Sequence, residues 1–279
     1  MNFADLHLHS LYSDGSDTVE ELVEKLLGND IETFALTDHD SIRGVPELLK
    51  LAEGKAKAIT GVEFSCLDEG APCHILAYRF PLENKKFLAL LKKGDERRFR
   101  NFRNRRNHLE KAHGIFFTEE ELAWLYSLPK IGKPHIAKIL IERGLATDTS
   151  DVIRRYLDGC KDGDERLSAS EVIAVTLEAG GIPIWAHPLG GEGEKHLSEA
   201  EFDALLPRLI AHGIKGMECY YSRYTKAEIA FLLQKAKENN LAVSGGSDYH
   251  GKNKTVTLGA LCAEELTVTT EELSILRLL

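Results

Sequence analysis

The sequence lacks paired cysteines, long apolar runs and an excess of positive charge. Its five cysteines are scattered and form no C-x-x-C pair, which argues against a disulfide framework or thiolate zinc site and favours the reducing cytoplasm. No run of about 18 apolar residues occurs, and no basic and apolar leader precedes Asp5, so we expect neither a membrane span nor secretion. The net charge of −9 argues against non-specific coating of nucleic acid, and no extended duplex partner is expected.

What is present is the composition of an ordinary globular protein. The chain has 279 residues, of which 43% are hydrophobic, enough for one large domain or a domain with an insertion. Apolar periodicity predicts strands at 3–8, 33–37, 58–64, 74–80, 182–186, 214–220 and 241–244. Helices are expected at 18–27, with Asp17 as N-cap, and at 45–53, 200–212 and 225–239.

Alternation of strands and helices predicts parallel strands that are joined by crossovers. We therefore expect an α/β fold, first a closed barrel of the TIM type and second an open doubly wound sheet. This barrel is expected in two parts, residues 1–91 and 165–279.

Between these parts, residues 92–164 show helix patterns and no strand signal, which predicts a helical insertion. Residues 92–111 contain nine Lys or Arg residues and three acids, a local excess of positive charge in an acidic protein. The insertion is interpreted as a substrate cap, and a solvated basic helix is a nearly equal alternative.

Two histidines open the chain in the stretch "ADLHLHSLYSDG". His7 and His9 are two residues apart on an expected strand, so their side chains point to the same face of the sheet. Together they can share a metal ion.

Further polar residues lie where other apolar strands begin or stop. They are Asp14, Asp38, His39 and Asp40, then Glu63, His74 and His187, and finally Asp248 and His250, which repeat the His7–His9 spacing. Barrel active sites are built at the carboxyl ends of the strands, so these side chains should converge. Neutral imidazole and carboxylate are ligands for zinc, manganese and iron, and a buried carboxylate needs a cation or strong donors to stay ionised.

The motifs "DLHLHSLYSDG", "TDHD", "GVEFS", "AHP" and "GGSDYHG" resemble, in order, those of the PHP (polymerase and histidinol phosphatase) family of metal-dependent phosphoesterases. The resemblance implies a distorted seven-stranded TIM-like (β/α)7 barrel that holds two or three divalent ions, manganese, iron or zinc. The metal ligands it implies are His7, His9, Asp14, His39, Glu63, His74, His187, Asp248 and His250.

The same resemblance implies how these ligands are shared. Glu63 would bridge two metals, with His7, His9 and Asp248 on one and His74 and His187 on the other. Asp14, His39 and His250 would hold a third.

We hypothesise that metal-activated water attacks phosphorus, with Glu63 and Asp248 holding the metals. His187, His250 or a water beside them would protonate the leaving oxygen. Asp5 and Asp38 are interpreted as acceptors for histidine N–H groups, with direct ligation as the minor alternative.

Four residues are predicted to bind substrate. Lys133 and His135 lie at an expected helix start where backbone N–H groups can receive a second phosphate. In the motif "ECYYSRYT", Tyr221 is predicted to stack on a base and Arg223 to bind phosphate, with core packing as the alternative for the tyrosines.

The insertion and this motif resemble the PHP branch of nucleoside 3',5'-bisphosphate phosphatases and 5'-3' oligoribonucleases. The leading hypothesis is therefore a cytoplasmic phosphohydrolase that acts on a small nucleotide or short RNA. Histidinol-phosphate phosphatase is the nearest alternative. Two alternatives come from other classes, an amidohydrolase and a non-catalytic metal-binding regulatory module. The amidohydrolase alternative is disfavoured because "GVEFS" offers Glu63 at a strand end where the usual binuclear amidohydrolase site has a carboxylated lysine.

Overall fold

The computed structural model describes residues 3–163 and 165–279. The chain forms two compact units, one made of Met1–Leu91 and Leu167–Leu279 and the other of Lys92–Arg166. No helix within the described residues is long and apolar enough to cross a membrane.

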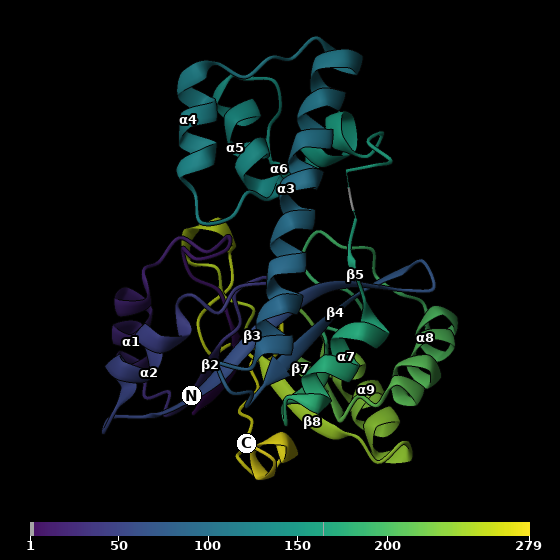
Figure 1. The fold of residues 1–279 in the computed structure, drawn as a ribbon. Helices are drawn as coiled ribbons and strands as arrows, with labels where there is room; N and C mark the ends of the chain where they lie inside the picture. Colours follow the sequence, from purple (N-terminus) through teal and green to yellow (C-terminus); the bar gives the residue numbers. More distant parts are fainter. Residues whose placement is uncertain (1–2, 164) are drawn as a thin grey trace. The chain divides into compact units, whose positions relative to one another are not determined.

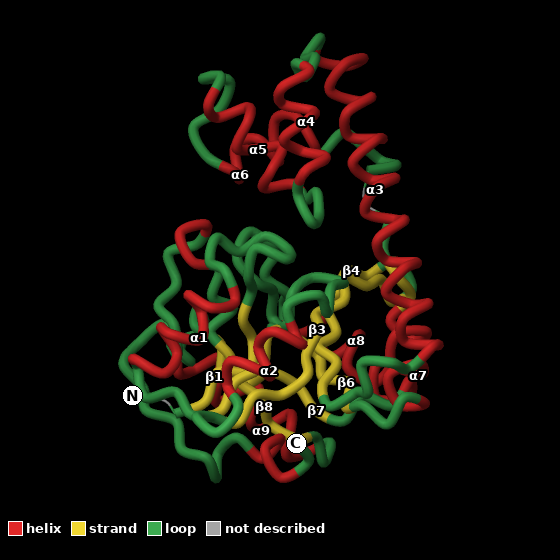
Figure 2. The backbone as a smooth tube through the Cα atoms, turned by 60° about the vertical axis from the view of Figure 1, so that its left-hand side comes forward, coloured by secondary structure: helices red, strands yellow, loops and turns green. Residues whose placement is uncertain are grey.

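The first unit is a nearly closed barrel of mixed α/β type. Its strands are β1 (Ala4–Leu8), β2 (Thr33–Leu36), β3 (Lys57–Asp68), β4 (Ala71–Tyr78), β5 (Leu167–Ser168), β6 (Ile182–Ala186), β7 (Gly216–Tyr221) and β8 (Ala242–Gly246). They pair in the order β1-β2-β3-β4-β6-β7-β8, and the short β5 pairs with β3. Figure 2 shows the strands gathered at the centre of this unit with helices outside them. The predicted seven-stranded barrel is confirmed, and the alternative of an open doubly wound sheet is wrong.

The helices of the barrel unit alternate with its strands, and the sequence predicted each of them except the one at Ala169–Glu178. They are α1 (Val19–Gly28), α2 (Val45–Ala52), α7 (Ala169–Glu178), α8 (Glu199–His212) and α9 (Lys226–Glu238), with 3-10 turns at Gly251–Asn253 and Ser274–Arg277. In Figure 1, α7, α8 and α9 lie on the side of the barrel formed by the later strands. The apolar faces of α7, α8 and α9 pack with most of the strands in one core cluster. Helices α1 and α2 pack on Leu8, Phe34 and Leu36 in a second cluster.

The N-cap prediction for α1 was one residue off. Thr18 caps the helix in a capping box with Glu21, because its hydroxyl accepts from Glu21 N (3.1 Å) and Glu21 accepts from Thr18 N. Asp17 instead accepts hydrogen bonds from Lys25 Nζ (2.6 Å) and Tyr249 Oη (2.9 Å). The Asp17 carboxylate therefore links α1 to the loop after β8 through hydrogen bonds.

The expectation of parallel strands fails at β4, which runs antiparallel to both β3 and β6. Glu69 (φ 47°) and Gly70 (φ 88°) form a two-residue turn between β3 and β4, the left-handed pair that such a hairpin requires. Ser65 lies opposite His74, and His74 lies opposite Ala186. Reversal of β4 thus brings His74, from the start of its strand, to the edge where the parallel strands end.

The second unit has a hydrophobic core of its own. It contains the later part of α3 (Lys85–His113), then α4 (Glu119–Ser127), α5 (Lys133–Glu142), α6 (Thr149–Val152) and a π-helical turn at Ile153–Leu157. Phe102, Leu125, Ile136 and Leu140 are buried together in it. Helical content without strands in its described residues agrees with the sequence pattern.

Barrel closure depends on contacts between β1 and the segment after β8. His9 N donates to Tyr249 O and Asp248 N donates to His7 O, both at 2.9 Å. The fully buried Asp5 carboxylate accepts from Ser247 N (2.9 Å), Ser247 Oγ (2.6 Å) and Gly259 N (2.9 Å).

Replacement of Asp5 by alanine should lower the free energy of unfolding by about 3 kcal/mol, because buried donors that lose their acceptor keep their full desolvation penalty. Urea unfolding measures the change. Asp5→Asn keeps one acceptor oxygen and should lose less, and equal midpoints for Asp5→Ala and the parent protein would contradict this role.

Candidate metal centre

All nine predicted ligands converge at one end of the barrel. Within the described residues, four overlapping groups have ligand atoms close enough to share an ion. They are His9–Asp14–His39–His250, His7–His9–Glu63, His39–Glu63–His74 and His74–His187–Glu194, with all ligand atoms in each group within 4.8 Å of one another. Because the strand ends bring together residues that are far apart in the sequence, the convergence expected from the polar pattern is present.

The Glu63 carboxylate lies at the centre of the cluster and is 1% exposed. Its Oε1 is 2.8 Å from His74 Nδ1 and 3.0 Å from His187 Nε2. Its Oε2 is 3.0 Å from His39 Nδ1 and 3.3 Å from His9 Nε2. The two oxygens therefore face two different sets of imidazoles, which is the geometry that a carboxylate shared between two ions requires.

Two aspartates complete the other side of the cluster. Asp248 Oδ1 is 3.3 Å from His9 Nε2 and 3.5 Å from His7 Nε2. Asp14 Oδ1 is 3.2 Å from His250 Nε2. These contacts place two more carboxylate oxygens among imidazole nitrogens.

Several buried atoms of the cluster indicate that the residues fit a metal. His7 Nε2, His9 Nε2, Asp14 Oδ1 and His250 Nε2 lie near oppositely charged groups, but none of these four atoms makes a hydrogen bond of acceptable angle within the described part of the chain. Buried polar atoms are almost always satisfied, and leaving them unpaired is costly. Imidazole nitrogens and carboxylate oxygens that point to a common centre form a donor set for manganese, iron or zinc.

Opposite charges set the pKa values in the metal-free chain. Burial lowers the pKa of His9, but Asp248 and Glu63 outweigh it and raise the value to about 9. For His187, burial likewise lowers the pKa, and Glu194 with Glu63 raises it to about 10. Burial raises the pKa of Glu63, yet the surrounding histidines hold it well below its usual range. Protons thus occupy positions that a cation would take.

The backbone is unusual at two of these residues. His187 (φ 27°) and Asp248 (φ 57°) have positive φ, a conformation that non-glycine residues rarely adopt and that concentrates at functional sites. Gly246, at the end of β8, allows β8 to approach β1 closely, because a Cβ at residue 246 would lie 2.3 Å from His7 Cβ.

Three residues that support the cluster were missed by the sequence analysis. Glu218 is fully buried in β7, accepts from His7 Nδ1 (3.0 Å) and also accepts from His187 N (2.8 Å). Glu194 lies 3.3 Å from His187 Nδ1, and Lys254 Nζ lies 2.7 Å from Asp248 Oδ2. For Glu218 a signal existed, since a carboxylate inside the apolar segment "GMECYY" needs a buried partner.

The interpretation of Asp5 and Asp38 was partly wrong. Among the described residues, the Asp5 carboxylate accepts from the backbone N of His7 (3.3 Å), whereas the ring Nδ1 of His7 donates to Glu218 (3.0 Å). Asp38 accepts from Ser10 N (2.8 Å) and Ser13 Oγ (2.6 Å). Both carboxylates therefore hold the site loops through backbone N–H groups and serine hydroxyls.

Of the four predicted substrate-binding residues, two lie in the barrel unit, and one of these, Tyr221, contacts the cluster. Tyr221 is 0% exposed and its Oη donates to Asp248 Oδ2 (2.9 Å), an arrangement that favours the core-packing alternative over stacking on a base. Arg223 is partly exposed and pairs with Glu192 at 2.5 Å.

The other two lie at the start of α5 in the second unit. Lys133 is the first residue of the helix, and His135 Nδ1 accepts a hydrogen bond from Gly132 N (2.9 Å). His135 therefore helps to cap α5.

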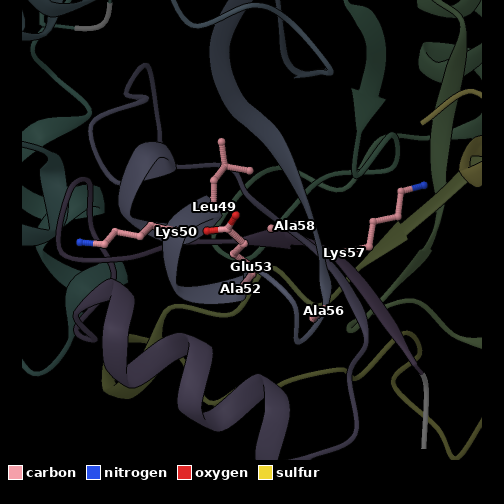
Figure 3. Close-up of a pocket in the computed structure, with 7 residues that line it drawn as sticks. All are labelled: Leu49, Lys50, Ala52, Glu53, Ala56, Lys57 and Ala58. Carbon is pink, nitrogen blue, oxygen red and sulfur yellow. The ribbon is translucent and has the colours of Figure 1, made fainter.

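A separate hollow lies between α2 and the start of β3. Its lining residues are Leu49, Lys50, Ala52, Glu53, Ala56, Lys57 and Ala58. Figure 3 shows the side chains of Lys50 and Lys57 extending away from each other. None of the lining residues belongs to the histidine cluster, and we assign the hollow no role.

Comparison with known proteins identifies the class. Residues 5–164 match the PHP domain family. The chain is 31% identical to a 5'-3' exoribonuclease of Haemophilus influenzae, over 91% of this chain and 92% of that protein. It is 29% identical to a phosphoribosyl 1,2-cyclic phosphate 1,2-diphosphodiesterase of Eggerthella lenta (89% and 94% covered) and 27% identical to a 3',5'-nucleoside bisphosphate phosphatase of Chromobacterium violaceum (88% and 86% covered).

Solved structures agree. A protein described as a metal-dependent phosphoesterase from Bifidobacterium adolescentis has a TM-score of 0.80 at 28% identity, with 99% of this chain and 96% of that chain covered. A protein described as an amidohydrolase from Chromobacterium violaceum, with bound sulfate and no metal, has a TM-score of 0.80 at 26% identity, with 93% of both chains covered. Fold, site and relatives together define a metal-dependent phosphoesterase. The chain belongs to the PHP family.

Metal binding by the metal-free protein should release protons, because His9 and His187 must lose theirs to act as ligands. Since both pKa values are raised, these protons are present at neutral pH, and manganese affinity should fall by roughly tenfold per pH unit for each proton released as pH drops from about 8 to about 6. Calorimetry in buffers of different ionisation enthalpy measures the release. Identical binding heats in all buffers would contradict it.

Proposed function

We propose that this phosphoesterase hydrolyses a phosphate ester of a small nucleotide, such as a nucleoside 3',5'-bisphosphate, or of a short oligoribonucleotide. The observation that carries the proposal is the position of Glu63, whose two oxygens face separate imidazole sets. Such a centre suits a dianionic phosphoryl group. Relatives of similar length that are named for nucleotide and RNA substrates support this substrate class.

We propose two or three divalent ions, manganese, iron or zinc. His74, His187 and Glu63 would hold one, His7, His9, Glu63 and Asp248 a second, and Asp14, His39 and His250 a third. When bound, such ions acidify water and neutralise the phosphoryl oxygens.

The residues around the cluster keep it charged and positioned. Burial raises the pKa of Asp248, but Lys254 is the largest of the opposing influences that hold it well below its usual range. Both ring nitrogens of His187 face carboxylates, and His250 Nδ1 is 2.8 Å from Asp248 O while its Nε2 faces Asp14. A water beside these rings, rather than the rings themselves, therefore delivers the proton to the leaving oxygen.

Metal analysis of gently purified protein should find more than one divalent ion per chain. His9→Ala and Asp248→Ala should lower both metal occupancy and hydrolysis, and removal of Glu63 should lower them most, because one carboxylate serves two ions. Elemental analysis combined with assays of 3',5'-bisphosphates, cyclic phosphates, histidinol phosphate and short RNA tests this. Full activity after exhaustive chelation, with no metal detected, would end the proposal.

Arg223 is proposed to hold a second phosphate of the substrate after exchange of its partner Glu192. Loss of such a charge-assisted contact amounts to about 1.5 to 3 kcal/mol. Arg223→Ala should therefore lower kcat/KM on a bisphosphate by roughly tenfold to a hundredfold, and should hardly change hydrolysis of p-nitrophenyl phosphate.

The matched control is Lys226→Ala, which removes a nearby exposed cation that pairs with Glu264. All assays need the same ionic strength, because salt screens charge–charge attraction. Equal slowing of both substrates by Arg223→Ala would show that Arg223 supports the metal centre instead.

The insertion is proposed to act as a substrate cap through Lys133 and His135. Lys133→Ala and His135→Ala should lower kcat/KM on the bisphosphate or on short RNA, again with little effect on the small monophosphate. Because His135 caps α5, its variant also needs a thermal unfolding measurement. If neither variant lowers kcat/KM on the bisphosphate or short RNA more than on the small monophosphate, the basic insertion is a solvated surface.

A further inference from the structure

The carboxylate of Glu194 contacts the outer nitrogens of two ligand histidines at once. His74 directs Nδ1 to Glu63 (2.8 Å), and Glu194 Oε1 lies 3.5 Å from its Nε2. His187 directs Nε2 to Glu63 (3.0 Å), and Glu194 Oε2 lies 3.3 Å from its Nδ1. Each ring therefore lies between two carboxylates, Glu63 on the inner side and Glu194 on the outer side.

We propose that Glu194 is a positioning residue that fixes the tautomers of both rings. A neutral imidazole carries one N–H, and the hydrogen bond made by one nitrogen decides which nitrogen is left to bind a metal. With Glu194 as acceptor, His74 carries its proton on Nε2 and His187 on Nδ1. The unprotonated Nδ1 of His74 and Nε2 of His187 then both face Glu63.

The two rings need opposite tautomers because the backbone segments that carry them enter the site in different orientations. His74 comes from the antiparallel strand β4, while His187 follows β6 in a positive-φ conformation. Their ring planes are nearly perpendicular, at 75°, with centroids 5.0 Å apart. A single carboxylate with one oxygen for each ring satisfies both, and Gly191 N holds it by donating to Oε2 (2.9 Å).

Glu194 lies on the solvent side of this arrangement. Its side chain is 32% exposed, against 11% for His74 and 1% for Glu63. The loop that carries it contains Gly190 and Gly193, both at positive φ. The competing role, direct ligation of an ion by Glu194, would use the outer nitrogens as ligands and would reverse both tautomers.

Nuclear magnetic resonance of the zinc-loaded protein with 15N-labelled histidine distinguishes these roles. We expect an Nε2–H signal for His74 and an Nδ1–H signal for His187, both shifted in Glu194→Gln. The opposite pair of tautomers would overturn the proposal, as would unchanged signals in the variant.

The matched control is Glu192→Gln, which removes the same charge from the same loop but contacts Arg223 instead of the rings. We expect Glu194→Gln to weaken zinc binding by about tenfold to a hundredfold. The number of ions bound at saturating zinc should stay the same in this variant. Glu192→Gln should leave the zinc affinity unchanged. Equal weakening by both variants, or loss of one ion in Glu194→Gln, would contradict a positioning role.

This inference rests on the proposed metal site, and neither experiment measures hydrolysis. Absence of zinc binding by the parent protein would refute the metal proposal itself. Normal zinc binding with the wrong tautomers would refute only the role of Glu194.

Discussion

The structure depends on compensation of a buried negative charge, the Glu63 carboxylate, by imidazoles from several strands. A carboxylate that is removed from water is stable only with opposite charge or strong donors beside it. Here His74, His187, His39 and His9 all lie within 3.3 Å of one of its oxygens. Metal ions would supply the same compensation, which is why the residues that hold the fold together at this end are also those that would bind metal.

The barrel serves this constraint through three local features. Antiparallel β4 delivers His74 from the start of a strand, and Gly246 lets β8 approach His7 closely. Glu218 connects β7 with both β1 and the end of β6 through His7 and His187 N. A second layer of carboxylates thus orients the first, as metal sites require.

The sequence predicted that these histidines and carboxylates converge, because each lies where an apolar strand begins or ends. It predicted all seven strands of the main path, since their apolar runs are short and bounded by turn residues. It did not reveal the direction of β4, because periodicity carries no information on strand direction and the hairpin at Glu69–Gly70 was overlooked.

Supporting contacts were harder to predict from sequence. Glu194 lies in a glycine-rich loop where an acidic residue is unremarkable, and only the fold places it between two rings. Asp5 and Asp38 were expected to accept from histidine rings, yet backbone N–H groups and serine hydroxyls donate to them. Such partners depend on long-range geometry that local sequence patterns do not encode.

The most direct test of the account is anomalous diffraction from crystals of the manganese-loaded protein. We expect peaks on both sides of Glu63, one beside His74 Nδ1 and His187 Nε2 and one beside His7, His9 and Asp248. Manganese bound elsewhere, or no peak within coordination distance of Glu63 at saturating metal, would contradict it.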